Sequence, residues 1–329
     1  MKLLTFRHKD GLRLGALLGS LVVDLAAAFQ ALPPEAKGAH SHLAALPADM
    51  LSFLQAGPPV WQAAQSVANW VHSSGLADTA AADFLSLLSK VHLGPPVPNP
   101  GKIIGVGMNY ADHAREQNLP PPKAPILFAK FSTAVIGPGE AITWPAEASS
   151  QVDYEAELAV VIGRRARLVT ADEAYDYIAG YTIVNDVTAR DVQFGDGQWV
   201  RGKSFDTFCP MGPYLVTADE VGDPHKLAIR CQLNGVVMQD SNTDQLIFDI
   251  PMLVEFISRT CTLLPGDVIC TGTPHGVGVF RDPPVFLKPG DLVEVEIERI
   301  GLLSNPVAAA AARRYWPVHL PTGDKAIIP

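Results

Sequence analysis

The sequence predicts a strand-dominated α+β protein, with a barrel-like arrangement of its larger part. Three observations predict this class. Short β-branched runs alternate with turn signals after residue 100, few helical patterns interrupt them, and a proline-rich segment separates them from an Ala- and Leu-rich beginning. The chain of 329 residues has room for one large domain or two smaller ones. Apolar residues make up 48% of it, which supplies a sizeable core and argues against disorder.

The proline-rich segment at residues 94–100, GPPVPNP, marks the expected domain boundary because so many prolines make a stiff, extended connector. We therefore expect a small N-terminal α+β domain over residues 1–93. The larger domain is expected over residues 101–310, and residues 311–329 are expected to form a C-terminal tail.

In the N-terminal part, residues 12–18 and 21–25 are predicted strands, and residues 61–71 and 78–90 are predicted helices. In the larger part, strands are predicted over residues 103–106, 126–130, 157–162, 181–187, 226–233, 267–271 and 292–297.

Helices are fewer in the larger part. Thr170 and Glu173 form a capping box that opens one predicted helix, and Gly180 is expected to end it. A second helix is predicted over residues 250–259, with Pro251 in its first turn.

Composition excludes several classes of function. The net charge is −9 and the pI is about 5.4, so bulk charge does not attract nucleic acid or anionic membranes. The four cysteines form no CxxC pair, which favours buried free thiols in a reducing compartment. The apolar run at residues 12–29 is broken by charged residues and glycines, so it predicts neither a signal peptide nor a membrane span. We therefore expect a cytoplasmic protein.

Three acids form a candidate metal site. Glu155 and Glu157 alternate with apolar residues in a predicted strand, so both carboxylates lie on one face, which becomes apolar immediately afterwards. Asp186 stands among β-branched neighbours in the next strand. Like charges so close repel one another, and a bound cation such as Mg²⁺ or Ca²⁺ removes that repulsion. The alternative is a charged strand edge exposed to solvent.

A histidine and a glutamate follow the strand at residues 103–106. The Gly-x-Gly turn at residues 105–107, before both of them, suggests a dinucleotide site. Tyr110, however, stands where the third glycine of that motif belongs. His113 and Glu116 are three residues apart, so a helix places them on one face, where the carboxylate orients the imidazole to take a proton from water. An ordinary surface pair is the alternative. Residues 118–122, rich in proline, end this helix and suggest a mobile lid.

Further polar side chains accompany the acids: Lys130, Arg190, Gln193 and Lys203. A buried lysine can bind a substrate carboxylate or stabilise an enolate. The loop at residues 271–278 contains glycines that permit close approach of the backbone to a ligand, although a turn without a role is an equal alternative. His275 in that loop is expected to face solvent.

Five phrases occur in one order along the chain: Gly-Met-Asn-Tyr-Ala-Asp-His at 107–113, Glu-x-Glu at 155–157, Asn-Asp-Val-Thr-Ala-Arg-Asp at 185–191, Lys-Ser-Phe at 203–205 and Thr-Gly-Thr-Pro at 271–274. In these phrases, residues 101–307 resemble the catalytic domain of the fumarylacetoacetate hydrolase family. The resemblance implies a mixed β-roll or barrel, a homodimer, and a 2-oxo acid substrate whose carboxylate and keto oxygen chelate Mg²⁺ or Mn²⁺, or Ca²⁺ in some members.

The resemblance also assigns roles to individual residues. It implies that the metal is held by Glu155, Glu157 and Asp186. It implies that His113 and Glu116 activate water and that Lys203 stabilises developing negative charge. The substrate-binding positions that it implies are Lys130, Arg190, Gln193 and Thr273.

Two departures limit what can be carried over. Phe131 stands where many members have proline after the lysine. The leader of 93 residues is absent from the short acylpyruvate hydrolases and is similar to that of longer bacterial members. Those members include diketo-acid hydrolases as well as isomerases and decarboxylases of aromatic catabolism.

The first hypothesis is hydrolytic cleavage of a C–C bond in a 2,4-diketo acid such as an acylpyruvate or fumarylpyruvate. The alternative is an isomerase, tautomerase or decarboxylase acting on a 2-oxo dicarboxylate, of the 2-hydroxyhepta-2,4-diene-1,7-dioate or oxaloacetate type. A third hypothesis is a binding module without catalysis, against which the acid trio, the His–Glu pair and the lysine argue.

Overall fold

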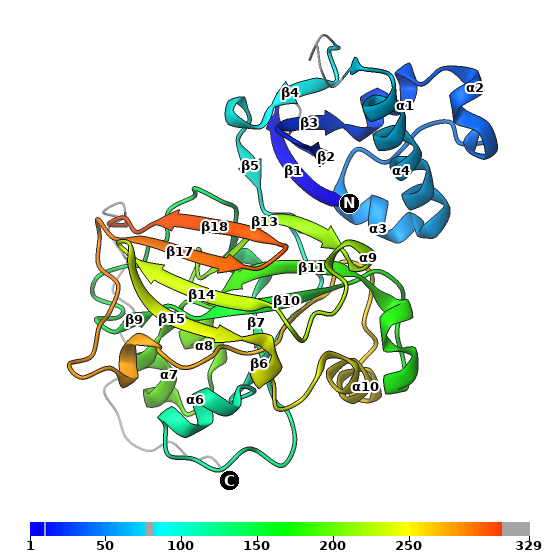
Figure 1. Cartoon of the computed structure of the whole chain (residues 1–329). Helices are drawn as coiled ribbons and strands as arrows, with labels where there is room; N and C mark the ends of the chain where they lie inside the picture. Colours follow the sequence, from blue (N-terminus) through cyan, green and yellow to red (C-terminus); the bar gives the residue numbers. More distant parts are fainter. Residues whose placement is uncertain (10, 77–81, 311–329) are drawn as a thin grey trace, which may run out of the picture.

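The computed structural model describes residues 1–9, 11–76 and 82–310, and it confirms a strand-dominated α+β fold (Figure 1). The predicted tail at residues 311–329 lies outside the described residues. Two sheets contain most of the strands, and short helices lie around them.

The main sheet has twelve strands, which come from both the N-terminal part and the larger part of the chain. In spatial order its path is β4 (Leu85–Leu87), β3 (Leu21–Asp24), β2 (Gly11–Leu18), β1 (Lys2–His8), β13 (Cys209–Thr217), β11 (Ile178–Asn185), β10 (Ala156–Ile162), β16 (Val268–Cys270), β6 (Ile103–Gly107) and β7 (Ile126–Lys130). Off this path, β5 (Leu93–Gly94) pairs with β1, and β8 (Val135–Ile136) pairs with β13. Because β1 pairs with β13, the N-terminal part and the larger part share one sheet. The domain boundary at residues 94–100 stays a prediction.

A second sheet of four antiparallel strands lies beside the first. Its order is β15 (Val236–Asn242), β14 (Ala228–Leu233), β17 (Leu292–Ile297) and β18 (Gly301–Pro306). A small ladder joins β9 (Val152–Asp153) to β12 (Thr188–Ala189). All seven strands predicted for the larger part are present, with their ends moved by a few residues.

The central strand β10 divides the core into two clusters because successive side chains point to opposite faces. Leu158 and Val160 pack into a cluster that includes residues of the four-stranded sheet. Ala159 and Val161 pack into a second cluster with residues of the N-terminal helices. The period-2 pattern that predicts this strand therefore also sets which side each residue faces.

Helices lie at the periphery (Figure 1). They are α1 (Leu25–Ala31), α2 (Pro34–Lys37), α3 (Met50–Ala56), α4 (Pro58–Ser73), α6 (Ala111–Glu116), α7 (Arg190–Asp196), α8 (Val200–Lys203), α9 (Ala218–Val221) and α10 (Ile250–Thr260). Short 3₁₀ turns are η1 (Gly38–His40), η2 (Leu88–Lys90), η3 (Ser132–Ala134), η4 (Ala171–Tyr177), η5 (Thr243–Gln245) and η6 (Gly278–Phe280). The predictions of α4 and α10 are confirmed, including Pro251 in the first turn of α10.

Two predicted helices are wrong in part. Residues 85–90 form β4 and η2, since β4 pairs with β3, and residues 78–81 of that prediction lie outside the described part. The capping box of Thr170 and Glu173 is present, but it opens the 3₁₀ turn η4, which ends at Tyr177. Gly180 lies inside β11, where an added Cβ would meet the carbonyl oxygen of Val216 at 2.1 Å. The close approach of β13 to β11 requires glycine at this position, and Gly180 does not end a helix.

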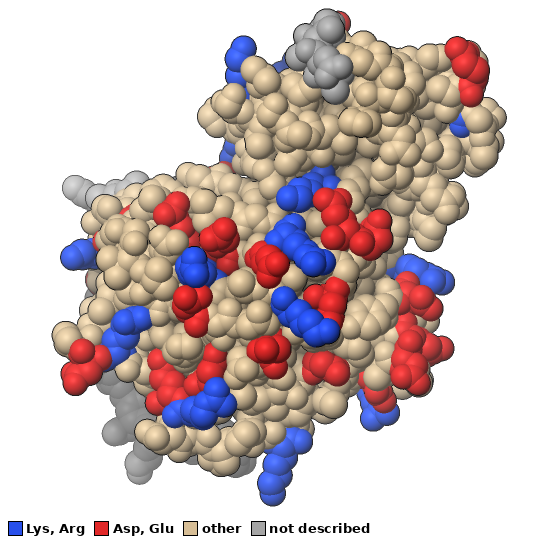
Figure 2. All heavy atoms as spheres, viewed as in Figure 1, with Lys and Arg blue, Asp and Glu red and all other residues tan. Residues whose placement is uncertain are grey.

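Within the described residues, no helix is both long and apolar enough to cross a membrane. On the face drawn in Figure 2, lysines and arginines are interspersed with acids and do not gather into a basic patch. The thiols of Cys209, Cys231 and Cys270 are buried and unpaired, as predicted, while Cys261 is partly buried.

Candidate metal centre and active site

The three predicted metal ligands meet where β10 begins and β11 ends. These strands are antiparallel, and Ala156 lies opposite Asn185. Glu155 and Asp186 therefore lie opposite each other, one residue beyond this pair. The backbone N–H of Asp186 donates to the carbonyl of Glu155 at 2.9 Å. Glu157 follows on the same face. One carboxylate oxygen from each of the three acids lies within 4.8 Å of the others, and all three residues are buried.

Basic side chains compensate two of the three acids. Lys203 Nζ lies 2.7 Å from Glu155 Oε2 and 2.7 Å from Asp186 Oδ2. Arg190 Nη2 lies 2.7 Å from Glu155 Oε1, and its Nε lies 2.9 Å from Asp153 Oδ2. Burial alone would raise the pKa of Glu155, but Lys203 and Arg190 outweigh it and lower the pKa to about 2.

Glu157 differs from the other two acids. Its Oε2 accepts a hydrogen bond from the backbone N–H of Gly272 at 2.8 Å, but no basic side chain of the described chain forms an ion pair with it. Burial, followed by repulsion from Asp186 and Glu155, raises its pKa well above the usual value. The centre therefore carries a carboxylate whose charge the protein leaves uncompensated.

This arrangement fits a hard divalent cation. The donors are all carboxylate oxygens, which suit Mg²⁺, Mn²⁺ or Ca²⁺ better than soft metals. Around the centre, the carboxylates of Asp153, Glu155, Glu157 and Asp186 face three cations, Lys130, Arg190 and Lys203. A bound divalent ion would turn this local negative excess into a positive one, which attracts an anionic substrate.

Lys130 lies behind the centre, on the side away from the ligand space. Its Nζ is 2.6 Å from Asp186 Oδ1, donates to the carbonyl oxygens of Val187 and Lys203, and is fully enclosed. Lys130 does not line the cavity in front of the acids. These contacts hold Asp186 in place. The contact of Lys130 with substrate stays a prediction.

The predicted His–Glu pair is formed on α6. His113 Nδ1 lies 2.9 Å from Glu116 Oε2, and both side chains are largely buried. Glu116 is itself held, because its Oε1 accepts a hydrogen bond from the backbone N–H of Gly276 at 2.8 Å. A carboxylate on Nδ1 fixes the tautomer that leaves Nε2 free of a proton. His113 can therefore act as a base through Nε2.

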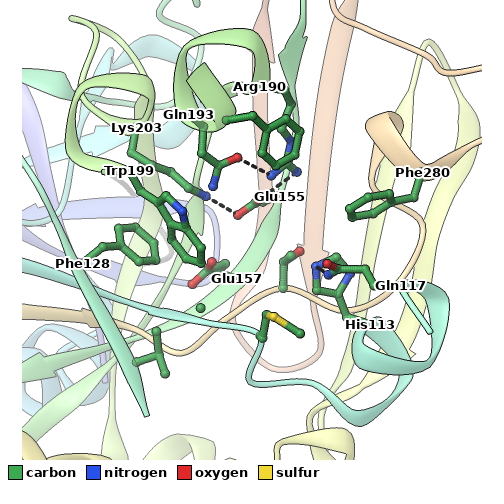
Figure 3. A pocket seen from close by; sticks show the side chains of 15 residues that line it. His113, Gln117, Phe128, Glu155, Glu157, Arg190, Gln193, Trp199, Lys203 and Phe280 are labelled. Carbon is green, nitrogen blue, oxygen red and sulfur yellow. Dashed lines mark hydrogen bonds and ion pairs between the residues drawn. The ribbon is translucent and has the colours of Figure 1, made fainter. Parts of the chain in front are cut away.

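Glu155 and Glu157 of the acid trio share with His113 one cavity of about 80 Å³ (Figure 3). Glu155, Glu157, Arg190, Gln193 and Lys203 form one side, and His113 with Gln117 and Phe280 forms another. The rest of the wall is largely apolar: Val106, Met108, Phe128, Phe194 and Trp199. The cavity thus combines an acidic centre, a base and an apolar wall.

The glycine-containing loop at residues 271–278 also reaches the site. Thr273 lines the cavity, and its hydroxyl accepts a hydrogen bond from the amide of Gln239 at 2.8 Å. Gln239 in turn accepts from the backbone N–H of Ala156 at 2.9 Å, so it ties the loop to the start of β10. His275 is about half exposed and pairs with Asp112, in agreement with its expected outward position.

Several residues of the site escaped the sequence analysis. Gln239 and Gln117 carry no charge and stand in no recognisable pattern. Asn109 lies in the Gly-Met-Asn-Tyr-Ala-Asp-His segment at residues 107–113. The sequence does not show, however, that its amide donates to the carbonyl oxygens of both Phe248 and Thr271. The signal for Asp153 was stronger, because it stands two residues before Glu155 in an acidic strand.

Comparison with known proteins agrees with this site. The family described as fumarylacetoacetate (FAA) hydrolase C-terminal matches residues 102–308, which contain every residue of the site. The Bos taurus protein named oxaloacetate tautomerase FAHD2A, mitochondrial, is 51% identical over 266 residues, which is 80% of each chain.

Solved structures of similar proteins cover nearly the whole chain. A fumarylacetoacetate hydrolase from Exiguobacterium antarcticum is 32% identical with a TM-score of 0.75, over 94% of this chain and all of that one. A 2-hydroxyhepta-2,4-diene-1,7-dioate isomerase from Mycobacterium marinum is 34% identical with a TM-score of 0.69, over 95% of this chain and all of that one. The chain is therefore an enzyme of the fumarylacetoacetate hydrolase family.

Proposed function

We propose that this enzyme catalyses keto–enol tautomerisation of a 2-oxo dicarboxylate, with oxaloacetate as the substrate, and that it requires a divalent metal. The observation that carries the proposal is that the base His113 lines the same cavity as Glu155 and Glu157, two acids of the trio. The name of the bovine relative, oxaloacetate tautomerase, supports the choice of substrate. Tautomerisation needs one proton to move between C3 and the oxygen on C2.

His113 supplies the base for this transfer. With Nδ1 donating to Glu116, Nε2 takes the proton from C3 of the keto acid, and Glu116 stabilises the imidazolium that forms. His113 then gives up this proton and the oxygen on C2 takes one up, directly from Nε2 or through solvent, which completes the enol. The reverse sequence returns the keto form. No atom is gained or lost overall.

Negative charge develops on the C2 oxygen while the proton is on His113. A divalent ion held by Glu155, Glu157 and Asp186 would act as a Lewis acid toward that oxygen. Lys203, which is already fixed between Glu155 and Asp186, adds a cation on the same side of the cavity. Gln193 accepts from Arg190 through Oε1 at 3.1 Å, which leaves its amide nitrogen available to the substrate.

Hydrolytic cleavage of a 2,4-diketo acid is the second candidate, and the hydrogen-bonded His113–Glu116 pair favours it. The same Nε2 would take a proton from water while the hydroxide adds to C4. The C3–C4 bond then breaks, and protonation of C3 in the resulting enolate gives pyruvate and a carboxylic acid. The similarity to the solved fumarylacetoacetate hydrolase supports this candidate.

One assay panel separates the candidates. Oxaloacetate, an acylpyruvate, fumarylpyruvate and 2-hydroxyhepta-2,4-diene-1,7-dioate are each incubated with the enzyme and Mg²⁺, and products are identified by chromatography. The proposal expects faster enol decay for oxaloacetate with no change of carbon skeleton. Pyruvate plus a carboxylic acid from the acylpyruvate, with no effect on oxaloacetate, would favour the hydrolase. Release of CO₂ from oxaloacetate would indicate a decarboxylase.

We also propose that the enzyme is a homodimer in the cytoplasm. The family resemblance of its sequence supports the dimer, and light scattering of the purified protein tests it. Relatives from cattle, rat and human that are named oxaloacetate tautomerase include the word mitochondrial in their names, so cell fractionation is the test of location.

A further inference from the structure

We propose that Gln117 determines specificity by binding the second carboxylate of a 2-oxo dicarboxylate through its side-chain amide. The inference rests on the proposed function, and it names the group that recognises the part of the substrate farthest from the acid trio.

The position of Gln117 is set by α6. It is the C-terminal cap of that helix, and its backbone N–H donates to the carbonyl oxygen of His113. Its side chain lines the cavity, and its amide nitrogen lies 2.8 Å from Nε2 of His113. Figure 3 shows the two side chains together, across the cavity from Glu155 and Lys203.

That contact occupies the nitrogen that must act as the base. An N–H donor on Nε2 agrees with the tautomer set by Glu116, but Nε2 cannot take a proton while the amide points at it. A bound substrate must therefore offer the amide another acceptor. The amide would otherwise remain on the base or lose its partner in a largely enclosed cavity.

The second carboxylate of oxaloacetate is attached to C3, the atom whose proton His113 removes. A carboxylate one bond from that atom therefore lies close to Nε2, and the Gln117 amide nitrogen is 2.8 Å from the same Nε2. When the Gln117 amide donates its hydrogen bond to this carboxylate and no longer to His113, Nε2 becomes free to take the proton. The base is therefore released when the correct substrate is bound.

The other side chains around the cavity offer no competing cation. Among the described residues that line it, the basic side chains besides His113 are Arg190 and Lys203, and both are ion-paired with carboxylates of the metal centre. Gln193 lies on that same side, beside Arg190. On the His113 side, the neighbour of the base is the ring of Phe280, with centroids 6.0 Å apart. A neutral amide is thus the donor available there.

The test compares two substrates on Gln117→Met, which keeps the length of the side chain and removes its donor. Oxaloacetate carries the second carboxylate, whereas phenylpyruvate has the same reacting C2–C3 unit with a phenyl ring instead. We expect kcat/KM for oxaloacetate to fall about tenfold or more, mainly through KM, as for loss of a hydrogen bond to a charged group. For phenylpyruvate the change should stay below about threefold.

The matched control is Gln245→Met, because Gln245 contacts Arg115 of α6 from outside the cavity and should leave both substrates unaffected. Equal losses on the two substrates would overturn the inference, since Gln117 would then only support His113. Unchanged kinetics with oxaloacetate would overturn it as well.

A binding measurement separates this inference from the proposed function. Calorimetry with Mg²⁺ and 3,3-difluorooxaloacetate, which lacks a C3 proton, reports recognition of the second carboxylate without turnover. The inference expects binding about tenfold weaker in Gln117→Met, whatever reaction the wild type catalyses. Equal affinity in the two proteins would overturn it. A wild type that binds this compound but does not tautomerise oxaloacetate would overturn the proposed function alone.

Discussion

The backbone N–H of Gly272 lies 2.8 Å from Oε2 of Glu157, so the loop after β16 reaches the acid trio directly. Gly272 has a φ of +104°, and an added Cβ would lie 2.9 Å from Asn109 Cβ and 3.0 Å from the carbonyl oxygen of Val106. Both backbone conformation and space therefore require glycine here.

We expect Gly272→Ala to lower the free energy of unfolding by about 1–3 kcal/mol through this strain and to weaken metal binding by displacing the N–H. Urea unfolding and a Mg²⁺ titration measure the two effects. Gly195→Ala is the control, because Gly195 lies in α7 with no heavy atom within 4 Å of the added Cβ. A Gly272→Ala protein as stable as wild type would contradict the expectation.

Substitution Glu157→Gln tests the metal centre through stability. Burial, followed by repulsion from Asp186 and Glu155, raises the pKa of Glu157, so without metal its ionisation costs stability as pH rises above the usual carboxyl range. In EDTA at pH 7 the variant should therefore be at least as stable as wild type.

With Mg²⁺ at 100 times its Kd, wild type should gain about 2.7 kcal/mol and Glu157→Gln should gain little. Thermal unfolding with and without Mg²⁺ measures this gain. Glu296→Gln, at an exposed position of β17, should behave as wild type. Equal stabilisation of wild type and Glu157→Gln by Mg²⁺ would argue against Glu157 as a ligand.

Removal of the base should affect the chemical step more than binding. His113→Ala is expected to lower kcat about 10²- to 10⁴-fold, because proton transfer from C3 loses its acceptor. Steady-state kinetics with oxaloacetate gives kcat and KM separately. His72→Ala, on the exposed side of α4, serves as control. An unchanged kcat in His113→Ala would mean that metal polarisation alone suffices.

Asp191 gives a prediction about pH. Burial would raise its pKa, but hydrogen bonds from the Ser149 hydroxyl at 2.6 Å and the Ser150 N–H at 2.9 Å outweigh it and lower the pKa. A lowered carboxyl pKa gives stability that is present above the unfolded pKa of about 3.9 and is lost as pH falls through the folded value. Asp191→Asn should thus be less stable than wild type at pH 7, and the difference should shrink below about pH 4. Urea unfolding at several pH values measures it, and a difference independent of pH would refute the account.

Alternating patterns made the strands and the acid trio predictable. Apolar residues on both sides of Glu155 and Glu157 fix the face on which the carboxylates lie, and the next strand along the chain supplies Asp186 because β10 and β11 are antiparallel neighbours. His113 and Glu116 meet because three residues make nearly one helical turn.

Long-range pairing accounts for what was missed. The helical pattern around Leu85–Leu87 was overridden by pairing with β3, and no local signal reports such a partner. Spacing also could not show that Lys130 lies behind Asp186, since that depends on how β7 and α8 pack. Gln117 and Gln239 remained unseen because an amide leaves no pattern of charge or period.

The central claim is that Glu155, Glu157 and Asp186 hold a metal that the enzyme needs to enolise a 2-oxo acid. The most direct test measures enol decay of oxaloacetate with enzyme stripped by EDTA, and again after Mg²⁺ or Mn²⁺ is restored, with the rate without enzyme subtracted. The account predicts loss of the enzymatic rate in EDTA and recovery with metal. Full activity in the metal-free enzyme would contradict it.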